Sequence, residues 1–144
     1  MICFWYHYIM KLLNKDADYA TRALVLMAKH PGKSYSVPEI ASELGLAGPF
    51  LRRVLQKAVK AGLLTSFKGK GGGFTMKSKP SKINLIEIIK AFQPKPSLID
   101  CITKGKPCMN TRTCPIRKEV LEIEKTVFDR LSRITVNDLL KGNK

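Results

Sequence analysis

Three cysteines lie close together in the second half of the chain, with the spacing Cys101-x6-Cys108-x5-Cys114. Thiolates are soft ligands that bind iron–sulfur clusters and zinc, and they also serve as redox sensors. Neither gap matches the short Cys-x2–4-Cys pairs of structural zinc sites, and the run is longer than those of ferredoxins. The spacing alone favours an iron–sulfur cluster and leaves a metal-free thiol switch or a zinc site open.

The first residues of the chain, MICFWYHYI, are aromatic and apolar but too few to cross a bilayer. They also lack the basic start and the cleavage site of a signal peptide. We interpret residues 1–9 as a non-native or misassigned extension before Met10, and we exclude Cys3 with them. The protein is then expected to be cytoplasmic, without a membrane partner and with reduced thiols, which disfavours structural disulfides.

The charge of the chain is strongly positive and unevenly distributed. Twenty-six Lys and Arg stand against 11 Asp and Glu, which gives a net charge of +15. No acidic residue occurs between Glu43 and Glu87. The nine basic residues of that stretch are Arg52, Arg53, Lys57, Lys60, Lys68, Lys70, Lys77, Lys79 and Lys82. Such a stretch attracts polyanions. It covers a predicted helix-turn-helix and a predicted hairpin, and this position favours double-stranded DNA over a membrane surface.

The start of this basic stretch has the pattern of a helix-turn-helix. Ser36 and Glu39 form a capping box for a short helix that ends at Gly45. A further helix begins near Pro49 and ends at Gly62, with apolar residues at helical spacing. Two helices joined by a tight, glycine-containing turn are typical of DNA-binding proteins.

A basic hairpin is predicted directly after these two helices. Residues 63–68 and 74–77 have strand character, and the glycine-rich stretch 69–73 forms the tip between them. The tip is not a Walker phosphate loop, because no Ser or Thr follows its lysine and no helix follows the loop. A hairpin in this position converts the helix-turn-helix into a winged helix.

Two further helices flank the winged part. The first covers residues 16–29, with Asp16 or Asp18 as its cap. The second begins after the wing at a capping box formed by Asn84 and Glu87. Both have apolar residues at helical spacing and are expected to complete the core.

These elements predict a mainly α fold with a small β wing, namely a winged helix-turn-helix followed by a long C-terminal dimerisation helix. The winged helix-turn-helix is expected over residues 10–92, a cysteine segment without secondary structure over 93–114, and the dimerisation helix with a C-terminal tail over 115–144. The long helix has more apolar surface than a small domain needs to cover its own core. Its apolar stripe consists of Ile116, Val120, Ile123, Val127, Leu131 and Ile134.

From Met10 onward the chain resembles the Rrf2 family of bacterial transcriptional regulators over nearly its whole length. The resemblance rests on segments that are specific only when taken together. They are residues 10–12 and 19–24, the helix 50–55 with 60–64, the wing 68–74, and the cysteine triad before a long helix. The resemblance implies a homodimeric winged-helix regulator, expected to be a repressor, that reads a pseudo-palindromic operator with half-sites about one helical turn apart.

The same resemblance implies which side chains contact DNA. The helix from Pro49 is expected to enter the major groove, where Pro49, Arg52 and Arg53 match positions that face bases. An arginine can bind guanine through two hydrogen bonds, and Arg53 could equally bind a phosphate. Lys68 matches the position that probes the minor groove. Phosphate contacts are expected from Lys57, Lys60, Lys68 and Lys70.

For the three cysteines, the resemblance implies a [2Fe–2S] or [4Fe–4S] cluster that senses iron, redox state or nitric oxide. One branch of the family has a histidine ligand three residues after the last cysteine, but this chain has Arg117 there. Another branch completes the site with an aspartate from the first helix of the partner subunit. That position corresponds to Asp18, with Asp16 as the nearby alternative, and the ligand role competes with the helix-cap role.

Two other functions are consistent with parts of the sequence. A metal-free regulator of the same family would sense through its thiols, and iron and sulfide analysis separates it from a cluster protein. A small iron–sulfur electron carrier would leave the basic stretch and the wing unexplained. The residues suggest no Ser–His–Asp or Cys–His set, so an enzyme is not expected.

Overall fold

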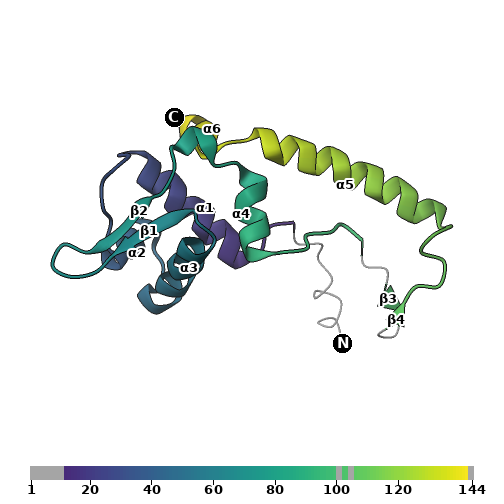
Figure 1. Ribbon diagram of the computed structural model, residues 1–144, viewed down its shortest axis with the longest axis horizontal. Helices are drawn as coiled ribbons and strands as arrows, with labels where there is room; N and C mark the ends of the chain where they lie inside the picture. The colour runs from purple at the N-terminus through teal and green to yellow at the C-terminus, as the bar shows by residue number, and fades with distance from the viewer. Residues whose placement is uncertain (1–11, 100–101, 104–105, 143–144) are drawn as a thin grey trace.

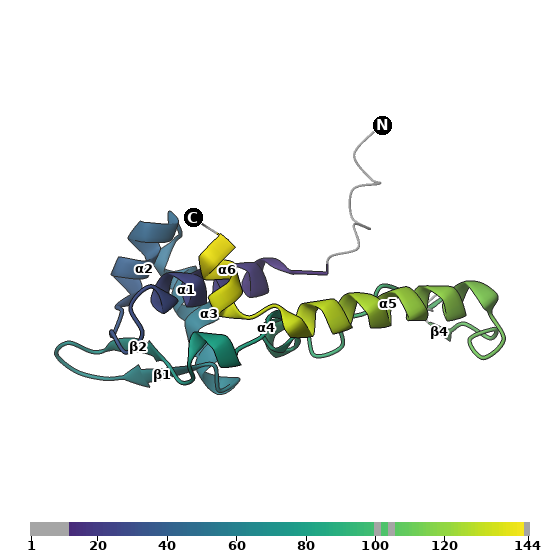
Figure 2. The same ribbon diagram turned by 90° about the horizontal axis from the view of Figure 1, so that it is seen from above.

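The computed structural model describes residues 12–99, 102–103 and 106–142. The expected extension over residues 1–9 and the first cysteine of the triad, Cys101, lie outside the described residues. The molecule consists of a body and one long helix that stands out from it, as Figure 1 and Figure 2 show. No helix within the described ranges has the length and the apolarity needed to cross a membrane.

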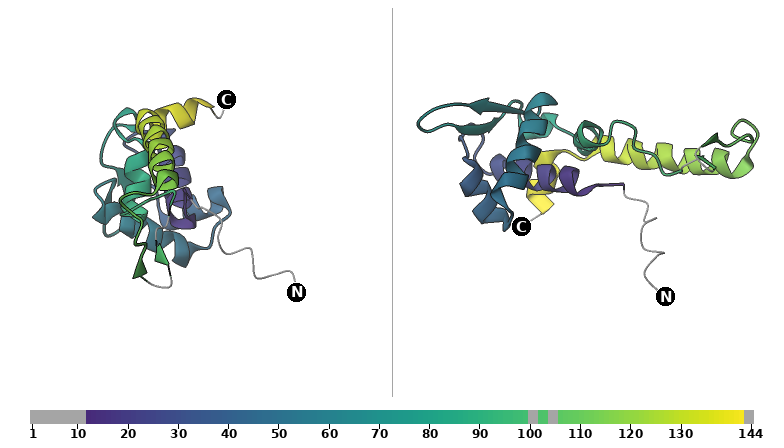
Figure 3. Two further views of the ribbon diagram at one scale, coloured as in Figure 1. Left: turned by 90° about the vertical axis from the view of Figure 1, so that its right-hand side faces the viewer. Right: turned by 90° about the horizontal axis from the view of Figure 1, so that it is seen from below.

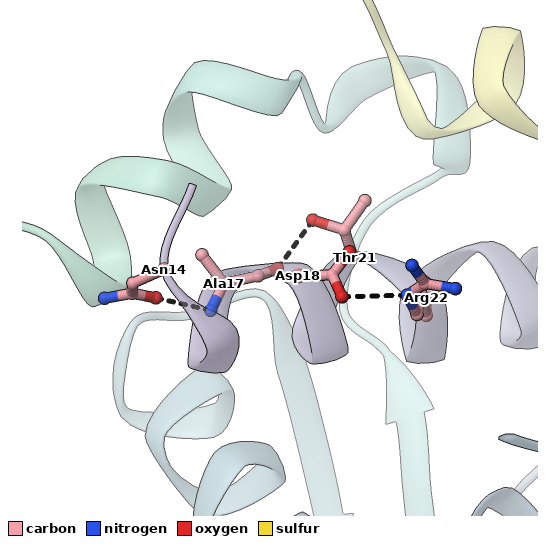
Figure 4. A network of polar contacts seen from close by, with 5 residues as sticks. All are labelled: Asn14, Ala17, Asp18, Thr21 and Arg22. Carbon is pink, nitrogen blue, oxygen red and sulfur yellow. Dashed lines mark hydrogen bonds and ion pairs between the residues drawn. The ribbon is translucent and has the colours of Figure 1, made fainter. Parts of the chain in front are cut away.

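Helix α1 (Lys15–Ala28) lies in the middle of the body, and its inner face is made of small and apolar residues. The prediction that Asp16 or Asp18 caps this helix is wrong. Asn14 is the N-cap, and its side-chain oxygen accepts a hydrogen bond of 2.8 Å from the Ala17 N–H (Figure 4). Both aspartates lie in the first turn, where the helix dipole favours a negative charge.

Helices α2 (Val37–Leu44) and α3 (Gly48–Lys60) form the predicted helix-turn-helix. The predicted capping box of α2 is confirmed, because the Ser36 hydroxyl accepts the Glu39 N–H and the Glu39 carboxylate accepts the Ser36 N–H at 2.7 Å. The predicted C-cap, Gly45, has a left-handed backbone with φ +63°, which glycine adopts without steric cost.

The wing is an antiparallel pair of strands, β1 (Leu64–Phe67) and β2 (Gly73–Met76), as predicted. Its tip turns through Gly69, whose φ of +99° is rarely adopted by residues with a side chain. On the other edge of β2, the backbone groups of Tyr35 exchange hydrogen bonds of 2.9 and 2.8 Å with those of Phe74. The base of the wing is therefore bound to the chain that leads into α2.

A short 3-10 turn, η1 (Pro80–Lys82), connects the wing to α4 (Leu85–Phe92). The capping box predicted for α4 is confirmed, because Asn84 accepts the Glu87 N–H at 2.9 Å and Glu87 accepts the Asn84 N–H at 3.2 Å. Helix α4 packs against α1 and α3. Its buried residues are Ile86, Ile88, Ile89 and Phe92.

The connection over residues 93–114 contains two short strands, β3 (Ile102–Thr103) and β4 (Lys106–Pro107), which pair antiparallel. The prediction that this segment has no secondary structure is therefore wrong. Each strand has only two residues, which is too short for an alternating pattern to be visible in the sequence.

Helix α5 (Pro115–Arg133) is the predicted long helix. Its predicted stripe included Ile134, but this residue lies beyond the helix, with an extended backbone at φ −88° and ψ 116°. The Ile134 carbonyl accepts the Leu85 N–H at 2.8 Å, so the chain turns here to pair with the start of α4.

The region expected to be a C-terminal tail contains another helix, α6 (Val136–Gly142), which packs on α1 and η1 (Figure 3). Val136 is completely buried and anchors it to the core. The Asp138 carboxylate accepts hydrogen bonds from the Thr135 hydroxyl at 2.7 Å and the Thr135 N–H at 2.9 Å. These bonds, the hydroxyl first, lower the pKa of Asp138. The end of the chain is thus part of the folded body.

Candidate nucleic-acid interface and cysteine segment

Helix α3 buries one face and exposes the opposite one. Its buried residues, Leu51, Val54, Leu55 and Ala58, recur every three or four positions and join the core. The exposed side chains between them are Pro49, Arg52, Arg53, Gln56, Lys57 and Lys60. All of these except Gln56 are residues that the sequence predicts to contact DNA.

A groove of about 720 Å³ lies between α3 and the wing. Arg52, Gln56 and Lys60 line it from α3, and Phe67 and Lys68 line it from the end of β1. Phe67 is 54% exposed and adds apolar surface to the groove. The groove therefore brings together three predicted DNA contacts from two separate elements.

Arg53 and Lys57 do not line this groove, because they contact residues on the other side of α3. The Arg53 Nη2 atom lies 4.0 Å from Asp16 Oδ1, and the guanidinium lies 5.0 Å from the centre of the Phe50 ring. The Lys57 Nζ atom lies 5.0 Å from the centre of the Phe92 ring. The predicted DNA contacts of α3 thus fall into two rows with different surroundings.

The two remaining predicted contacts lie at the margins of this surface. Pro49 is exposed in the first turn of α3, where the helix dipole carries partial positive charge. Lys70 is exposed at the tip of the wing. The position of Lys70 is suited to the phosphate backbone of a duplex.

Two of the three predicted cluster ligands, Cys108 and Cys114, are described, and both are half-buried free thiols. Cys114 is the N-cap of α5, and its Sγ atom accepts the Arg117 N–H at 3.4 Å. The Cys114 N–H donates to the Asn110 carbonyl at 2.9 Å, and the Thr111 hydroxyl donates to the Cys108 carbonyl. These bonds fold the residues between the two thiols into consecutive turns at the start of α5.

The chain that leads to the cysteines is bound to α5 through Glu124. The Glu124 carboxylate accepts the Leu98 N–H at 2.6 Å and the Ser97 hydroxyl at 2.8 Å. These contacts join residues that are 26 and 27 positions apart, so no local pattern in the sequence indicates them. Glu124 limits the positions that the segment before the cysteines can take.

Asp18, the predicted fourth ligand, lies on the exposed side of α1. Its carboxylate accepts a hydrogen bond of 2.9 Å from Arg22 Nε (Figure 4), and this bond raises the pKa of Arg22. Because Asn14 caps the helix, Asp18 is not required as a cap. Cys114 is the N-cap of α5 and Cys108 directly follows β4, and this end of α5 is remote from the body containing α1 (Figure 2). One chain therefore does not bring Asp18 to these two thiols.

A metal site is not assembled within the described residues of one chain, since no three of their His, Cys, Asp and Glu side chains form a group that could hold an ion. Cys101 is outside that description. The ligand set expected from the sequence thus depends on Cys101 and on a second subunit.

The model of the Rrf2 family, described as an iron-dependent transcriptional regulator, matches residues 13–142. The chain belongs to the Rrf2 family. It is 28% identical over 131 residues to Protein aau3 from Rhizobium meliloti (strain 1021), a match that covers 90% of this chain and 85% of that protein.

Solved structures agree with the Rrf2 fold. IscR from T. potens superposes with a TM-score of 0.69 at 26% identity, over 92% of this chain and 88% of that one. CymR, the global cysteine regulator of B. subtilis, superposes with a TM-score of 0.65 at 24% identity, over 90% of this chain and 95% of that one. Both have the mainly helical fold with a small antiparallel wing that the sequence predicts.

This Rrf2 protein is accordingly a DNA-binding regulator of transcription and not an enzyme. Its groove between α3 and the wing is lined by the basic side chains of Arg52, Lys60 and Lys68, which attract a polyanion. Its two described thiols lie on a different part of the molecule.

Proposed function

We propose that this Rrf2 regulator binds a pseudo-palindromic operator as a homodimer and that an iron–sulfur cluster adjusts the binding. The observation that carries the proposal is the combination of a basic groove beside α3 with free thiols at the start of α5. We expect the protein to act in the cytoplasm and to repress the genes that it controls.

For the DNA contacts, we propose that α3 enters the major groove and that the wing contacts the neighbouring backbone. Pro49, Arg52 and Arg53 would face bases. Lys57, Lys60, Lys68 and Lys70 would contact phosphates. Phosphate contacts supply affinity that falls steeply with salt, whereas base contacts supply the sequence preference.

The homodimer is supported by the apolar side of α5. No residue of this helix, which the structure describes completely, is buried in a single chain. Ile116 is 69% exposed and Ile123 is 56% exposed, and the two are seven positions apart, so they lie on one side of the helix. Isoleucines at this spacing are expected to pack against the same helix of a second chain.

The donor set fits an iron–sulfur cluster of the [2Fe–2S] or [4Fe–4S] type. Cys108 and Cys114 are free thiols, and cysteine sulfur is the usual ligand of such clusters. Cys101, Cys108 and Cys114 would hold the cluster, with Asp18 of the partner subunit as the fourth ligand. When bound, the cluster would supply an iron centre that reacts with oxidants or nitric oxide and reflects iron supply.

Asp18 does not cap α1, so a ligand role for its carboxylate does not compete with a helix-cap role. Its carboxylate is held by Arg22 within the chain, however, so ligation would have to replace or share that hydrogen bond. Asp16 is the nearby alternative, and its carboxylate lies 4.0 Å from Arg53 Nη2 of α3.

Anaerobic purification tests the cluster. The wild-type protein is expected to be coloured and to contain iron and sulfide, and Cys108→Ala is expected to lose both. Cys3→Ala is the matched control, since it removes a thiol that the proposal does not use. A colourless, iron-free wild-type preparation with unimpaired operator binding contradicts the cluster and favours the metal-free thiol switch.

A further inference from the structure

The exposed face of α3 is divided into two rows of side chains, and only one row faces the wing. We call Arg52, Gln56 and Lys60 the groove row, because all three line the groove between α3 and the wing. They are spaced by four residues and therefore lie along one side of the helix. Gln56 stands between the two basic residues and is the one neutral side chain of the row.

The second row consists of Arg53 and Lys57, and both have partners in the folded chain. Arg53 contacts Asp16 and the Phe50 ring, and Lys57 lies over the Phe92 ring. Among the residues that the structure describes, no side chain or backbone group forms such a contact with Arg52 or Gln56. The groove row is thus free to bind a duplex without first breaking an intramolecular contact.

The chemistry of Gln56 differs from that of its neighbours. Its carboxamide carries no charge, so it gains little from a phosphate, whereas it offers a donor and an acceptor side by side. This pair matches the N7 acceptor and the N6 amino donor that adenine presents in the major groove. Arg52 has the donors that match the O6 and N7 acceptors of guanine.

We propose that Gln56 contributes to the sequence specificity of this regulator by binding an adenine in each half-site, near a guanine bound by Arg52. Four residues of helix correspond to about 6 Å along its axis, whereas base pairs are stacked about 3.4 Å apart. The two bases are therefore expected about two positions apart. The inference rests on the proposed function, since it requires α3 to lie in the major groove.

Selection of binding sites from a randomised duplex library tests this inference. Sites selected by the wild-type dimer are expected to share an adenine, and Gln56→Ala is expected to lose the preference at that position alone. Replacement of this adenine in the best site is expected to weaken wild-type binding about 5- to 150-fold and to have little effect on Gln56→Ala. Gln56→Glu is expected to move the preference toward cytosine, whose amino group a carboxylate can accept.

Lys60→Ala is the matched control, because it removes a charged neighbour of the same row. It is expected to weaken binding to all sequences and to keep the wild-type preference. The slope of log affinity against log salt concentration is expected to become smaller by about one. Circular dichroism of each variant verifies that α3 is intact.

If Gln56→Ala selects the same sites as the wild type, the inference is wrong while the proposed function stands. If the wild-type protein selects no sequence at all, both are wrong. If Gln56→Ala loses the adenine preference and Gln56→Glu prefers cytosine at the same position, the inference is supported directly.

Discussion

Arg53 has two kinds of negative partner available, a carboxylate of its own chain and the operator. Its Nη2 atom lies 4.0 Å from Asp16 Oδ1, and the two side chains are 69% and 29% exposed. An ion pair as exposed as this contributes at most about 1 kcal/mol to folding, because water screens it. DNA could therefore compete for the guanidinium, and if Arg53 binds the operator, the contact with Asp16 is expected to weaken that binding.

Substitution of Asp16 by Asn tests this competition. We expect operator affinity to rise at least about twofold, because Arg53 no longer has to leave a carboxylate, while stability to urea changes by less than about 1 kcal/mol. Fluorescence anisotropy at fixed salt measures the affinity. Glu43→Gln on α2 removes the same charge without a contact to Arg53, so an equal rise in both variants contradicts the competition.

Asp18 shows why the role of a single residue depends on its neighbours. Its sequence position suits a helix cap as well as a metal ligand, and both roles need the same carboxylate oxygens. The structure assigns the cap to Asn14 and leaves the Asp18 carboxylate with Arg22. Asparagine and aspartate cap helices about equally well, so local preference could not distinguish them.

Among the elements, the wing includes a glycine, Gly73, whose backbone lies directly against another part of the chain. A Cβ atom added at Gly73 would lie 2.5 Å from the Tyr35 carbonyl oxygen and 2.8 Å from its carbon. Backbone atoms cannot move away cheaply, because Tyr35 and Phe74 are joined by two hydrogen bonds. The close approach of two backbones explains why a residue without a side chain begins β2.

Gly73→Ala is therefore expected to destabilise the protein by about 1–3 kcal/mol, by separating β2 from Tyr35. Urea unfolding measures the change. Gly48→Ala at the start of α3 serves as the control, because nothing lies within 4 Å of a Cβ atom there. An equal stability of the two variants would show that the wing tolerates the extra carbon.

At the scale of the whole molecule, the wing and the start of α5 lie at opposite ends (Figure 3). A change at the cysteines must therefore reach α3 either along α5 and the body or through a second chain. The exposed isoleucines of α5 favour the second route, because a paired α5 would bring the cysteine segment of one chain toward the body of the other.

Ile123→Glu tests whether α5 forms the dimer. We expect the wild type to sediment as a dimer and the variant as a monomer with reduced thermal stability, because a carboxylate cannot be buried unpaired between two helices. Analytical ultracentrifugation measures the mass. Lys125→Gln makes the same change in charge on another side of α5 and should remain dimeric. A dimeric Ile123→Glu protein would exclude this side of α5 as the interface.

The sequence by itself determined the features that depend on neighbouring residues or on total charge. The capping boxes at Ser36 and Asn84, the glycine end of α2 and the acid-free basic stretch are local patterns, and the elements they predict are present. Only the tertiary structure decided that Arg52 and Gln56 face the groove while Arg53 faces Asp16, that Glu124 holds the segment before the cysteines, and that α6 packs on α1. These contacts join residues far apart in the chain. Their energy depends on how the helices pack, and no periodic pattern in the sequence indicates them.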